Sequence, residues 1–435
     1  MKKIILIFFA IAIHASASAQ AIKAYFNQSV DNTVSSITDA HTSINLDDTI
    51  CSIINAANTT LDIAVWDNGS SKIVTALNNA YTRGVQVRYI SATNSTNIAL
   101  IGLNSNIPVL KRTANLTVDV MHNKFIIADN QILLTGSMNF GNGSMFDDYN
   151  NIVIISDNNI AQAYTTEFNE MWGTTGAQPN TGNSKFGPDK TDNTTHNFSI
   201  GSSPVQLYFS PTDNTTNQII NAINSADHTL DIAMFTFIND DLGNAVVAAK
   251  NRGVTVRAII ENVSYFGSEY NNLLSNGINA LSHAALANDF HHKYCIIDAM
   301  QGSSDPIVVT GSHNWTNSAE QDNDENTLII HDMIIAQQYT EEFSKRFSES
   351  GGVGIEETNT QESVLIFPNP STGNFTIKNI PPYTTIKIHD LSGKLCHSKE
   401  NVNEAEVIHI ELSSGFYFIT IKTEEAVTTE KMIIE

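Results

Sequence analysis

The chain has 435 residues and a mass of 47.5 kDa, which predicts two or three domains. Its 41% hydrophobic and 16% charged residues exclude a disordered chain, and the short apolar runs after the N-terminus exclude a multi-span membrane protein. A net charge of −22 argues against a broad nucleic-acid footprint but not against one small basic pocket. The three cysteines, Cys51, Cys295 and Cys396, are far apart and indicate neither a disulfide framework nor a zinc site.

Residues 1–19 have the three parts of a secretory signal peptide. Lys2 and Lys3 form a basic start, residues 4–13 are almost continuously apolar, and Ala17-Ser18-Ala19 precedes the expected new N-terminus. The apolar run is too short for a membrane anchor, and the alternative is a buried N-terminal helix. The sequence therefore predicts an exported protein, whose mature chain carries a charge of about −24.

The body of the chain repeats itself. TLDIAVW at 60–66 reappears as TLDIAMF at 229–235, and RGVQVR at 83–88 reappears as RGVTVR at 252–257. Both matches have an offset of 169 residues, as does a third, between His122 and His291. Three blocks in one register indicate a duplicated unit of about 150 residues, a usual domain size. We call the copies the first and the second repeat.

Each repeat has the pattern of alternating strands and helices. In the first, 61–66 is typical of a buried strand, and Ile73, Leu77 and Tyr81 mark an amphipathic helix that ends at Gly84 before a strand at 85–90. This order predicts a parallel or mixed sheet with helices on its faces. The expected parts are a signal peptide (1–19), the first repeat (22–173), a connector (174–202), the second repeat (203–348), a linker (349–362) and a C-terminal domain (363–435).

One constellation of polar residues occurs in both repeats. The first copy comprises His122, Lys124, Asp129, Gly136, Ser137 and Asn139, and the second comprises His291, Lys293, Asp298, Gly311, Ser312 and Asn314, with six extra residues at 301–306. His and Lys two positions apart on a strand point to the same face. Gly permits close backbone approach, and Ser and Asn offer neutral donors. One His, one ammonium and two neutral donors suit a cluster of phosphoryl oxygens.

Both copies resemble the HxKxxxxD…GSxN signature of the phospholipase D superfamily of phospholipases, cardiolipin synthases and hydrolases, and nucleases. The resemblance covers roughly residues 40–345. It implies an α/β fold of two pseudo-twofold-related α-β-α sandwich units packed face to face around one active site, and a monomer, because one chain holds both half-sites. It also implies phosphodiester cleavage through a covalent phosphohistidine without metal or cofactor: one His attacks phosphorus, and the other protonates the leaving oxygen and then activates water.

The remaining positions receive expected roles on the same basis. We expect phosphoryl oxygens to be held by Lys124, Lys293, Asn139 and Asn314, with Ser137, Ser312, Gly136 and Gly311 in supporting positions. Asp129 and Asp298 are interpreted as structural residues of a turn. His292 and His313 are interpreted as packing or solvent residues, and Cys295 as a small buried hydrophobe.

One difference between the repeats bears on the roles of the two histidines. At equivalent positions the second repeat has Glu325 and the first has Asn150. We expect Glu325 to bind His291 and raise its pKa, which suits a general acid, and Asn150 to leave His122 neutral, which suits a nucleophile.

Aromatic residues, basic residues and net charge bear on the substrate. Aromatic residues that could dock acyl chains, or equally be core, are Trp66, Phe235, Phe237, Tyr265, Phe266 and Trp315. Basic residues are scattered: Lys111, Arg112, Arg83 and Arg252. The acidic balance favours a phospholipid, more easily one with a zwitterionic headgroup, over a nucleic acid. A nuclease is the alternative, and a non-catalytic binding protein is less favoured because both motifs are intact.

The C-terminal residues 363–435 have short alternating strands, expected at 374–378, 384–389, 407–411 and 416–422, between turn signals. This predicts a small all-β sandwich. Pro368-Asn369-Pro370, the LSSGFYF run at 412–418 and the late Lys431 are similar to the sorting domain of cargo of the type IX secretion system. That resemblance implies contact with the secretion machinery and passage across the outer membrane, followed by release or surface attachment. The alternative is a carbohydrate-binding or adhesive sandwich.

Overall fold

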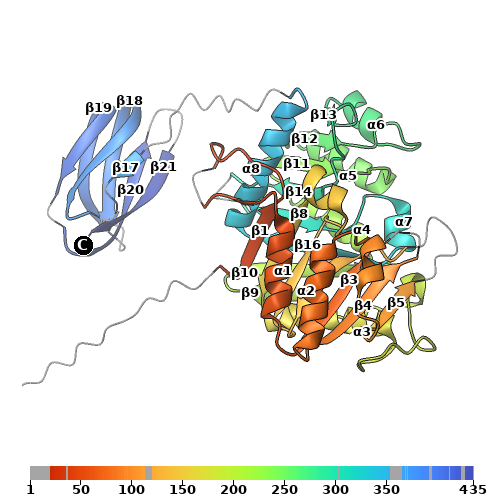
Figure 1. Cartoon of the computed structure of the whole chain (residues 1–435). Helices are drawn as coiled ribbons and strands as arrows, with labels where there is room; N and C mark the ends of the chain where they lie inside the picture. The colour runs from red at the N-terminus through yellow and green to blue at the C-terminus, as the bar shows by residue number, and fades with distance from the viewer. Residues whose placement is uncertain are drawn as a thin grey trace, which may run out of the picture. The chain divides into compact units, whose positions relative to one another are not determined.

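The computed structural model describes residues 20–35, 38–93, 95, 97–112, 120–300, 304–352, 365–367, 369, 371–390, 394–410, 412–422 and 427–434. The expected signal peptide lies outside these residues. The chain divides into two units, Met1–Gly352 and Val353–Glu435. Both repeats therefore belong to one unit, which is described first (Figure 1).

The first repeat forms a mixed eight-stranded sheet in the order β2-β1-β8-β7-β6-β3-β4-β5. Its strands are β1 (Ile22–Phe26), β2 (His41–Thr42), β3 (Thr60–Val65), β4 (Gln86–Ala92), β5 (Val109–Arg112), β6 (Lys124–Ala128), β7 (Ile132–Gly136) and β8 (Asn151–Ser156). Its helices are α1 (Leu46–Ala56), α2 (Ser71–Thr82) and α3 (Asn158–Trp172), with short turns η1 (Ile98–Gly102) and η2 (Gly143–Asp147).

The second repeat forms a second eight-stranded sheet in the order β13-β12-β11-β14-β15-β16-β10-β9. Its strands are β9 (Asn197–Ile200), β10 (Ser203–Ser210), β11 (Thr229–Met234), β12 (Thr255–Ile260), β13 (Asn279–Ser282), β14 (Lys293–Ile297), β15 (Ile307–Gly311) and β16 (Glu325–His331). Its helices are α4 (Thr215–Asn224), α5 (Asp240–Asn251), α6 (Tyr270–Ser275), α7 (Asn317–Gln321) and α8 (Met333–Glu349), and η3 (Gly187–Asp189) precedes them.

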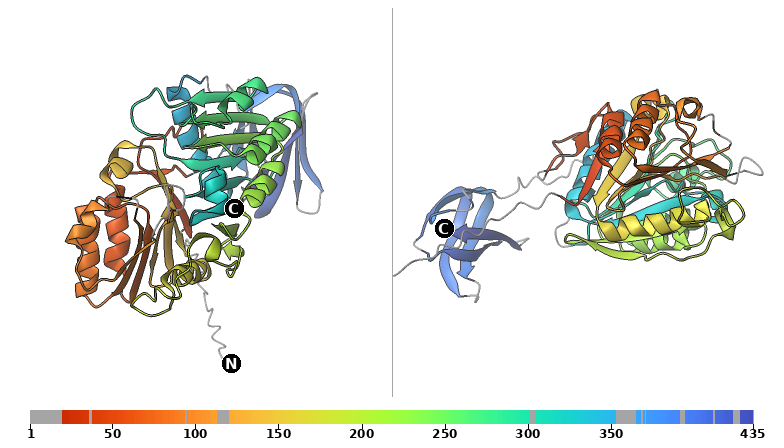
Figure 2. Two further views of the ribbon diagram at one scale, coloured as in Figure 1. Left: turned by 90° about the vertical axis from the view of Figure 1, so that its right-hand side faces the viewer. Right: turned by 60° about the horizontal axis from the view of Figure 1, so that its bottom comes forward.

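Three apolar cores show how the layers pack. The outer core of the first repeat joins α1 and α2 to one face of the first sheet, and that of the second joins α4 and α5 to the second sheet. The central core combines both sheets with α3 and α8, so these helices lie between the repeats. Figure 2 shows the outer helices on opposite sides of the unit. The fold class predicted from the sequence is confirmed.

Local sequence explains the element boundaries of the first repeat. The hydroxyl of Ser70 accepts the Ile73 N–H at 3.2 Å and caps α2, which covers the apolar residues expected to form a helix. Gly84, at φ +93°, then turns the chain into β4.

The expected connector 174–202 is only partly a connector. Its last residues form β9, which pairs with β10 in the second sheet, and Lys190 within it is buried. No periodic pattern marks β9 in the sequence, because it is a four-residue edge strand in a run of Asn, Thr and Gly.

The second unit is all-β, as expected. Its strands β17 (Leu365–Phe367), β18 (Asn374–Asp390), β19 (Leu395–His409), β20 (Gly415–Lys422) and β21 (Val427–Ile434) form one hydrogen-bonded sheet rather than two separate ones. The strands expected at 374–378 and 384–389 are one long strand, β18, with register shifts between them. None of the described helices is long and apolar enough to cross a membrane.

Candidate active site

The two catalytic motifs begin at equivalent edges of the two sheets. In the first sheet Lys124, at the start of β6, pairs with Val65 at the end of β3, and Val65 pairs with Ser91 near the end of β4. The second sheet has the equivalent pairs: Lys293 with Met234, and Met234 with Ile260. The motif residues therefore lie where parallel strands end, the usual place for a site in such sheets.

Backbone bridges bring these two edges together. Met121 bridges to Asp324, and Tyr149 bridges to Phe290. The His122 N–H donates to the Asp324 carbonyl at 3.0 Å. The residue before His122 is thus bridged to the residue before Glu325, and the residue before His291 is bridged to the residue before Asn150. The two half-sites therefore form one site.

The carboxylate of Glu325 binds His122, not His291. Its two oxygens lie 2.8 and 2.9 Å from His122 Nδ1, and the Glu325 side chain is fully buried. The pairing expected within each repeat is therefore wrong. Its physical reason is the crossed bridge, which carries Glu325 across the pseudo-twofold axis to the histidine of the first repeat.

His291 is held by the corresponding amide, that of Asn150. The Asn150 Nδ2 donates to the Ser144 carbonyl at 2.9 Å, which orients the Oδ1 toward His291 Nδ1 at 2.9 Å. The imidazole N–H of His291 therefore lies on Nδ1. Both motif histidines are oriented through Nδ1, which leaves both Nε2 atoms for a substrate.

The two motif serines support these histidine partners. Ser137 Oγ donates to Asn150 Oδ1 at 2.8 Å, and Ser312 Oγ donates to Glu325 Oε2 at 2.6 Å. Each hydroxyl also accepts a backbone N–H, from Asn151 or Asn326, at 3.0 Å. Both serines are fully buried, so they act through the histidine partners and not on substrate.

The motif glycines also act structurally. Gly136 and Gly311 have φ values of +154° and +142°, and a Cβ would lie 2.3 and 2.2 Å from the carbonyl oxygen of Asn151 and Asn326, respectively. They let the strand carrying Asn150 or Glu325 approach closely. Both glycines therefore have a packing role.

The motif lysines are buried beside the histidines. Lys124 Nζ donates to the His122 carbonyl at 2.6 Å, and Lys293 Nζ donates to the His291 carbonyl at 2.8 Å. Burial lowers the pKa of Lys124 to about 7, although Glu325 opposes the shift, and burial lowers the pKa of Lys293 well below its ordinary range. An anionic ligand bound beside the two lysines would stabilise the ammonium form of both.

The motif asparagines are open to a ligand. The Oδ1 atoms of Asn139 and Asn314 are buried and have no hydrogen-bond partner among the described residues. An amide that is not committed to the protein can turn its Nδ2 to a phosphoryl oxygen. That Asn139 and Asn314 hold phosphoryl oxygens stays a prediction.

The motif aspartates lie away from the histidines, at the far ends of β6 and β14. Asp129 accepts backbone N–H groups from residues 58–60, and Asp298 does so from residues 227–229. Burial would raise the pKa of Asp129, but these hydrogen bonds hold it at about 2. The geometry is that of a turn, as the sequence predicts.

The pKa values of the two histidines differ because their partners differ. Burial lowers both. At His122 the charge of Glu325 opposes the shift, and the pKa falls to about 4. At His291 the charges of Lys293 and Lys124 add to the shift, and the pKa falls well below its ordinary range.

Two of the aromatic residues singled out in the sequence line the site. The Trp66 ring lies 6.1 Å from the His122 ring, and the Phe235 ring lies 4.8 Å from the His291 ring. Phe237 and Trp315 are instead buried against each other in the core, as is Cys295. The other two, Tyr265 and Phe266, are exposed.

Sequence reasoning missed a buried charge cluster behind His122. Asp324 Oδ2 accepts a hydrogen bond from Arg112 Nη1 at 2.8 Å, and Lys190 Nζ lies 3.2 Å from Asp324 Oδ1. Lys190 also donates to Glu167 at 2.5 Å. We call Arg112, Glu167, Lys190 and Asp324 the charge cluster. No spacing or periodicity marks Lys190, which lies in a polar connector.

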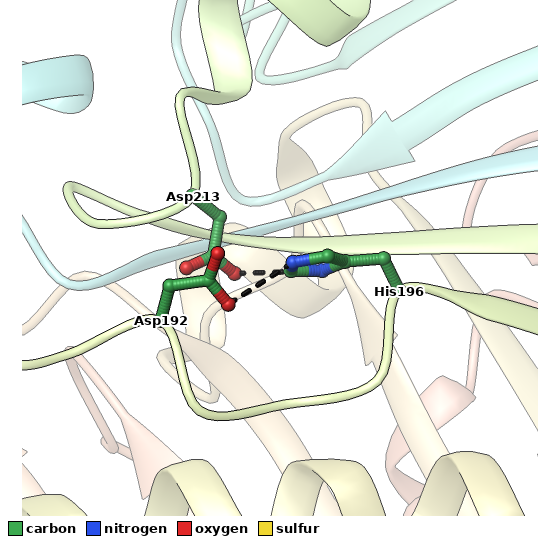
Figure 3. A group of neighbouring side chains, drawn as sticks. All are labelled: Asp192, His196 and Asp213. Carbon is green, nitrogen blue, oxygen red and sulfur yellow. Dashed lines mark ion pairs between the residues drawn. The ribbon is translucent and has the colours of Figure 1, made fainter.

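Among the described residues, one group of His and Asp side chains lies close enough to hold a metal ion: Asp192, His196 and Asp213 (Figure 3). His196 Nδ1 already donates to the Leu207 carbonyl at 2.9 Å, and its Nε2 lies 3.1 Å from Asp192. Asp213 accepts the Phe209 N–H at 2.7 Å. Burial would lower the pKa of His196, but the hydrogen bonds to Leu207 and Asp192 raise it, which favours ion pairs of His196 with Asp192 and Asp213.

Comparison with known families decides the assignment of the fold. Residues 50–172 and 219–347 match the family model described as "Cardiolipin synthase, PLD-like domain". The chain belongs to the phospholipase D-like family. Residues 365–435 match the secretion system C-terminal sorting domain, so this phospholipase D-like protein carries a type IX sorting domain.

Individual relatives of the phospholipase D-like chain are similar over part of its length. It is 34% identical over 140 residues to the mitochondrial cardiolipin hydrolase of Xenopus tropicalis, which is 32% of this chain and 63% of that protein. The human mitochondrial cardiolipin hydrolase is 32% identical over 31% of this chain and 51% of its own length. The chain thus spans less than two thirds of these relatives.

Two solved structures are also similar. The phosphatidylserine synthase of Haemophilus influenzae has a TM-score of 0.50 and 14% identity over 68% of this chain and 83% of its own, which shows the fold. The phospholipase D family member Nuc of Salmonella typhimurium has 26% identity and a TM-score of 0.30 over 34% of this chain and 94% of its own.

Proposed function

We propose that the protein is an exported, metal-independent phosphodiesterase that hydrolyses a phospholipid headgroup ester through a covalent phosphohistidine. The observation that carries the proposal is the crossed pairing: Glu325 and Asn150 each hold one motif histidine by Nδ1. We expect the two Nε2 atoms, the two buried lysines and the two asparagine amides to bind one phosphodiester. The ammonium groups supply the positive charge that a phosphoryl transition state requires.

In the first step, His122 Nε2 attacks phosphorus and the bond from phosphorus to the headgroup oxygen breaks. The negative charge of the bound phosphodiester favours the imidazolium form of His291, which carries protons on both Nδ1 and Nε2. His291 then gives its Nε2 proton to that oxygen and becomes neutral. In the second step, neutral His291 takes a proton from water, the hydroxide attacks phosphorus, and the bond from phosphorus to His122 breaks. Lys124, Lys293, Asn139 and Asn314 hold the phosphoryl oxygens in both steps.

The carboxylate favours His122 as the nucleophile, for a reason that differs from the one expected from the sequence. When Nε2 bonds to phosphorus the imidazole ring becomes cationic, and the buried charge of Glu325 stabilises that cation through Nδ1–H. Asn150 gives His291 no such charge, so His291 releases its proton more readily. The pairing expected from the sequence was wrong, while the nucleophile it named remains our proposal.

A phospholipid is favoured over nucleic acid on two grounds. The net charge of −22 repels a polyanion, and the curated relatives reported above are cardiolipin hydrolases. The sorting domain supports an extracellular or cell-surface location, reached through the secretion machinery.

The test compares substrates after EDTA treatment of the mature chain. We expect hydrolysis of phosphatidylcholine vesicles, loss of it on the order of 10⁴-fold in His122→Ala, and no cleavage of single-stranded DNA. Cleavage of DNA with untouched phosphatidylcholine and cardiolipin vesicles would make the protein a nuclease. Activity that EDTA abolishes would contradict the metal-independent mechanism.

Replacement of Glu325 tests the role of its charge. Glu325→Gln keeps a hydrogen-bonding group but removes the charge that opposes the lowered pKa of His122. We expect the maximal kcat/KM to fall by about 10²–10³-fold, because the cationic intermediate loses its partner. The acid limb of the pH profile, set by neutral His122, should move to lower pH. A limb that stays in place would show that another group titrates there.

A further inference from the structure

Two charge-poor segments leave the sheets beside the active site. Residues 93–110 contain no Asp, Glu, Lys or Arg, and residues 262–288 contain only Glu269, in a chain that is 16% charged. The first segment follows β4 and the second follows β12, which are equivalent strands of the two repeats. We call the two segments together the apolar rim.

The apolar rim holds most of the exposed large apolar side chains of its unit. Within the described part of the first unit there are ten, and six belong to the rim: Ile98, Ile101, Tyr265, Phe266, Leu274 and Leu286. Phe266 is fully exposed and Ile101 is 88% exposed. The exposed apolar side chains are thus concentrated on two segments that follow equivalent strands, and exposed apolar groups that lie together mark an interaction surface.

Both rim segments are anchored next to the catalytic histidines. Asn97 Nδ2 donates to the carbonyl of Trp66 at 3.1 Å, and the Trp66 ring contacts His122. The Asn262 N–H donates to the carbonyl of Phe235 at 3.0 Å, and the Phe235 ring contacts His291. Each segment is therefore hydrogen-bonded to the residue that lies against one motif histidine ring.

We propose that the apolar rim docks on the surface of a zwitterionic phospholipid bilayer and presents the active site to the headgroups. The inference rests on the proposed function, since a phospholipid offers its phosphodiester only at such a surface. Apolar and aromatic side chains without charge insert at the boundary of headgroups and acyl chains. An anionic surface would repel a chain of charge −22, whereas a zwitterionic one does not.

The test removes apolar area from each half of the rim. In the mature chain, Tyr265→Ser/Phe266→Ser and Ile98→Ser/Ile101→Ser should each weaken binding to phosphatidylcholine vesicles at least about tenfold in co-sedimentation. Hydrolysis of the vesicles should fall in parallel. Turnover of soluble bis(p-nitrophenyl) phosphate should stay within about twofold of the unmodified chain, because no rim residue touches the reacting atoms.

Met333→Ser is the matched control. Met333 is exposed, but it begins α8 after β16 has reached the opposite edge of the sheet. We expect vesicle binding by this variant to be unchanged. An equal loss in Met333→Ser, unchanged binding in both rim variants, or a matching loss of soluble turnover would each overturn the proposal.

The catalytic variant separates this inference from the proposed function. His122→Ala should bind vesicles as the unmodified chain does. A chain that binds vesicles through the rim but hydrolyses none would overturn the proposed function and leave the rim proposal standing. A chain that binds no vesicles, or whose rim variants lose cleavage of single-stranded DNA instead, would overturn the rim proposal.

Discussion

His291→Ala should accumulate a covalent phosphoryl adduct on His122, and His122→Ala should form none. With a p-nitrophenyl phosphodiester the leaving group needs no proton, so the first step can proceed without His291. The second step then lacks its base, and the adduct persists. Intact-protein mass spectrometry followed by peptide mapping should find the phosphoryl group on His122, while steady-state turnover falls on the order of 10⁴-fold.

A second substitution tests whether the charge of Glu325 stabilises the adduct on His122. In His291→Ala the adduct on His122 is still stabilised by Glu325 through Nδ1, at 2.8 Å in the free protein. Adding Glu325→Gln to His291→Ala should therefore shorten the adduct's lifetime. An adduct on His291 in the His122→Ala variant would reverse the assignment of nucleophile and acid.

The fold was predictable because its signals are local and repeated. The TLDIA strands, the helix marked by Ile73 and Leu77, and a constant offset of 169 residues each report on neighbouring residues in the chain. The edge strand β9 and the single C-terminal sheet were not predictable, because they depend on pairing with distant strands.

The composition of the site was predictable, but its pairing was not. The motif residues of the two repeats meet at one site, as the resemblance implies. The sequence places Glu325 and His291 in the same repeat and so favours a bond between them. The bond to His122 arises from the bridge between Met121 and Asp324, a contact over 203 residues that no spacing encodes.

The charge cluster shows how the fold holds His122 in place. The carbonyl of Asp324 accepts the His122 N–H, and the next residue supplies the carboxylate that binds its ring. Asp324 itself is fixed by Arg112 and Lys190, both of which are buried. Burial would lower the pKa of Lys190, but Glu167 and Asp324 raise it, so its ammonium stays charged.

Lys190→Met should lower the free energy of unfolding by about 3–5 kcal/mol at neutral pH, because it leaves two buried carboxylates with one cation. Lys185→Met, which removes an exposed partner of Glu170, should cost about 0–1 kcal/mol.

Burial already raises the pKa of Glu167 to about 7. The charge of Lys190 opposes this shift, so the loss of Lys190 raises the pKa of Glu167 further. In the folded variant Glu167 then keeps a proton that the unfolded chain has lost. The loss in free energy of unfolding, relative to the unmodified chain, should therefore grow from pH 5.5 to pH 8 in urea denaturation. An equal deficit at both pH values would show that Lys190 acts through packing and not through charge.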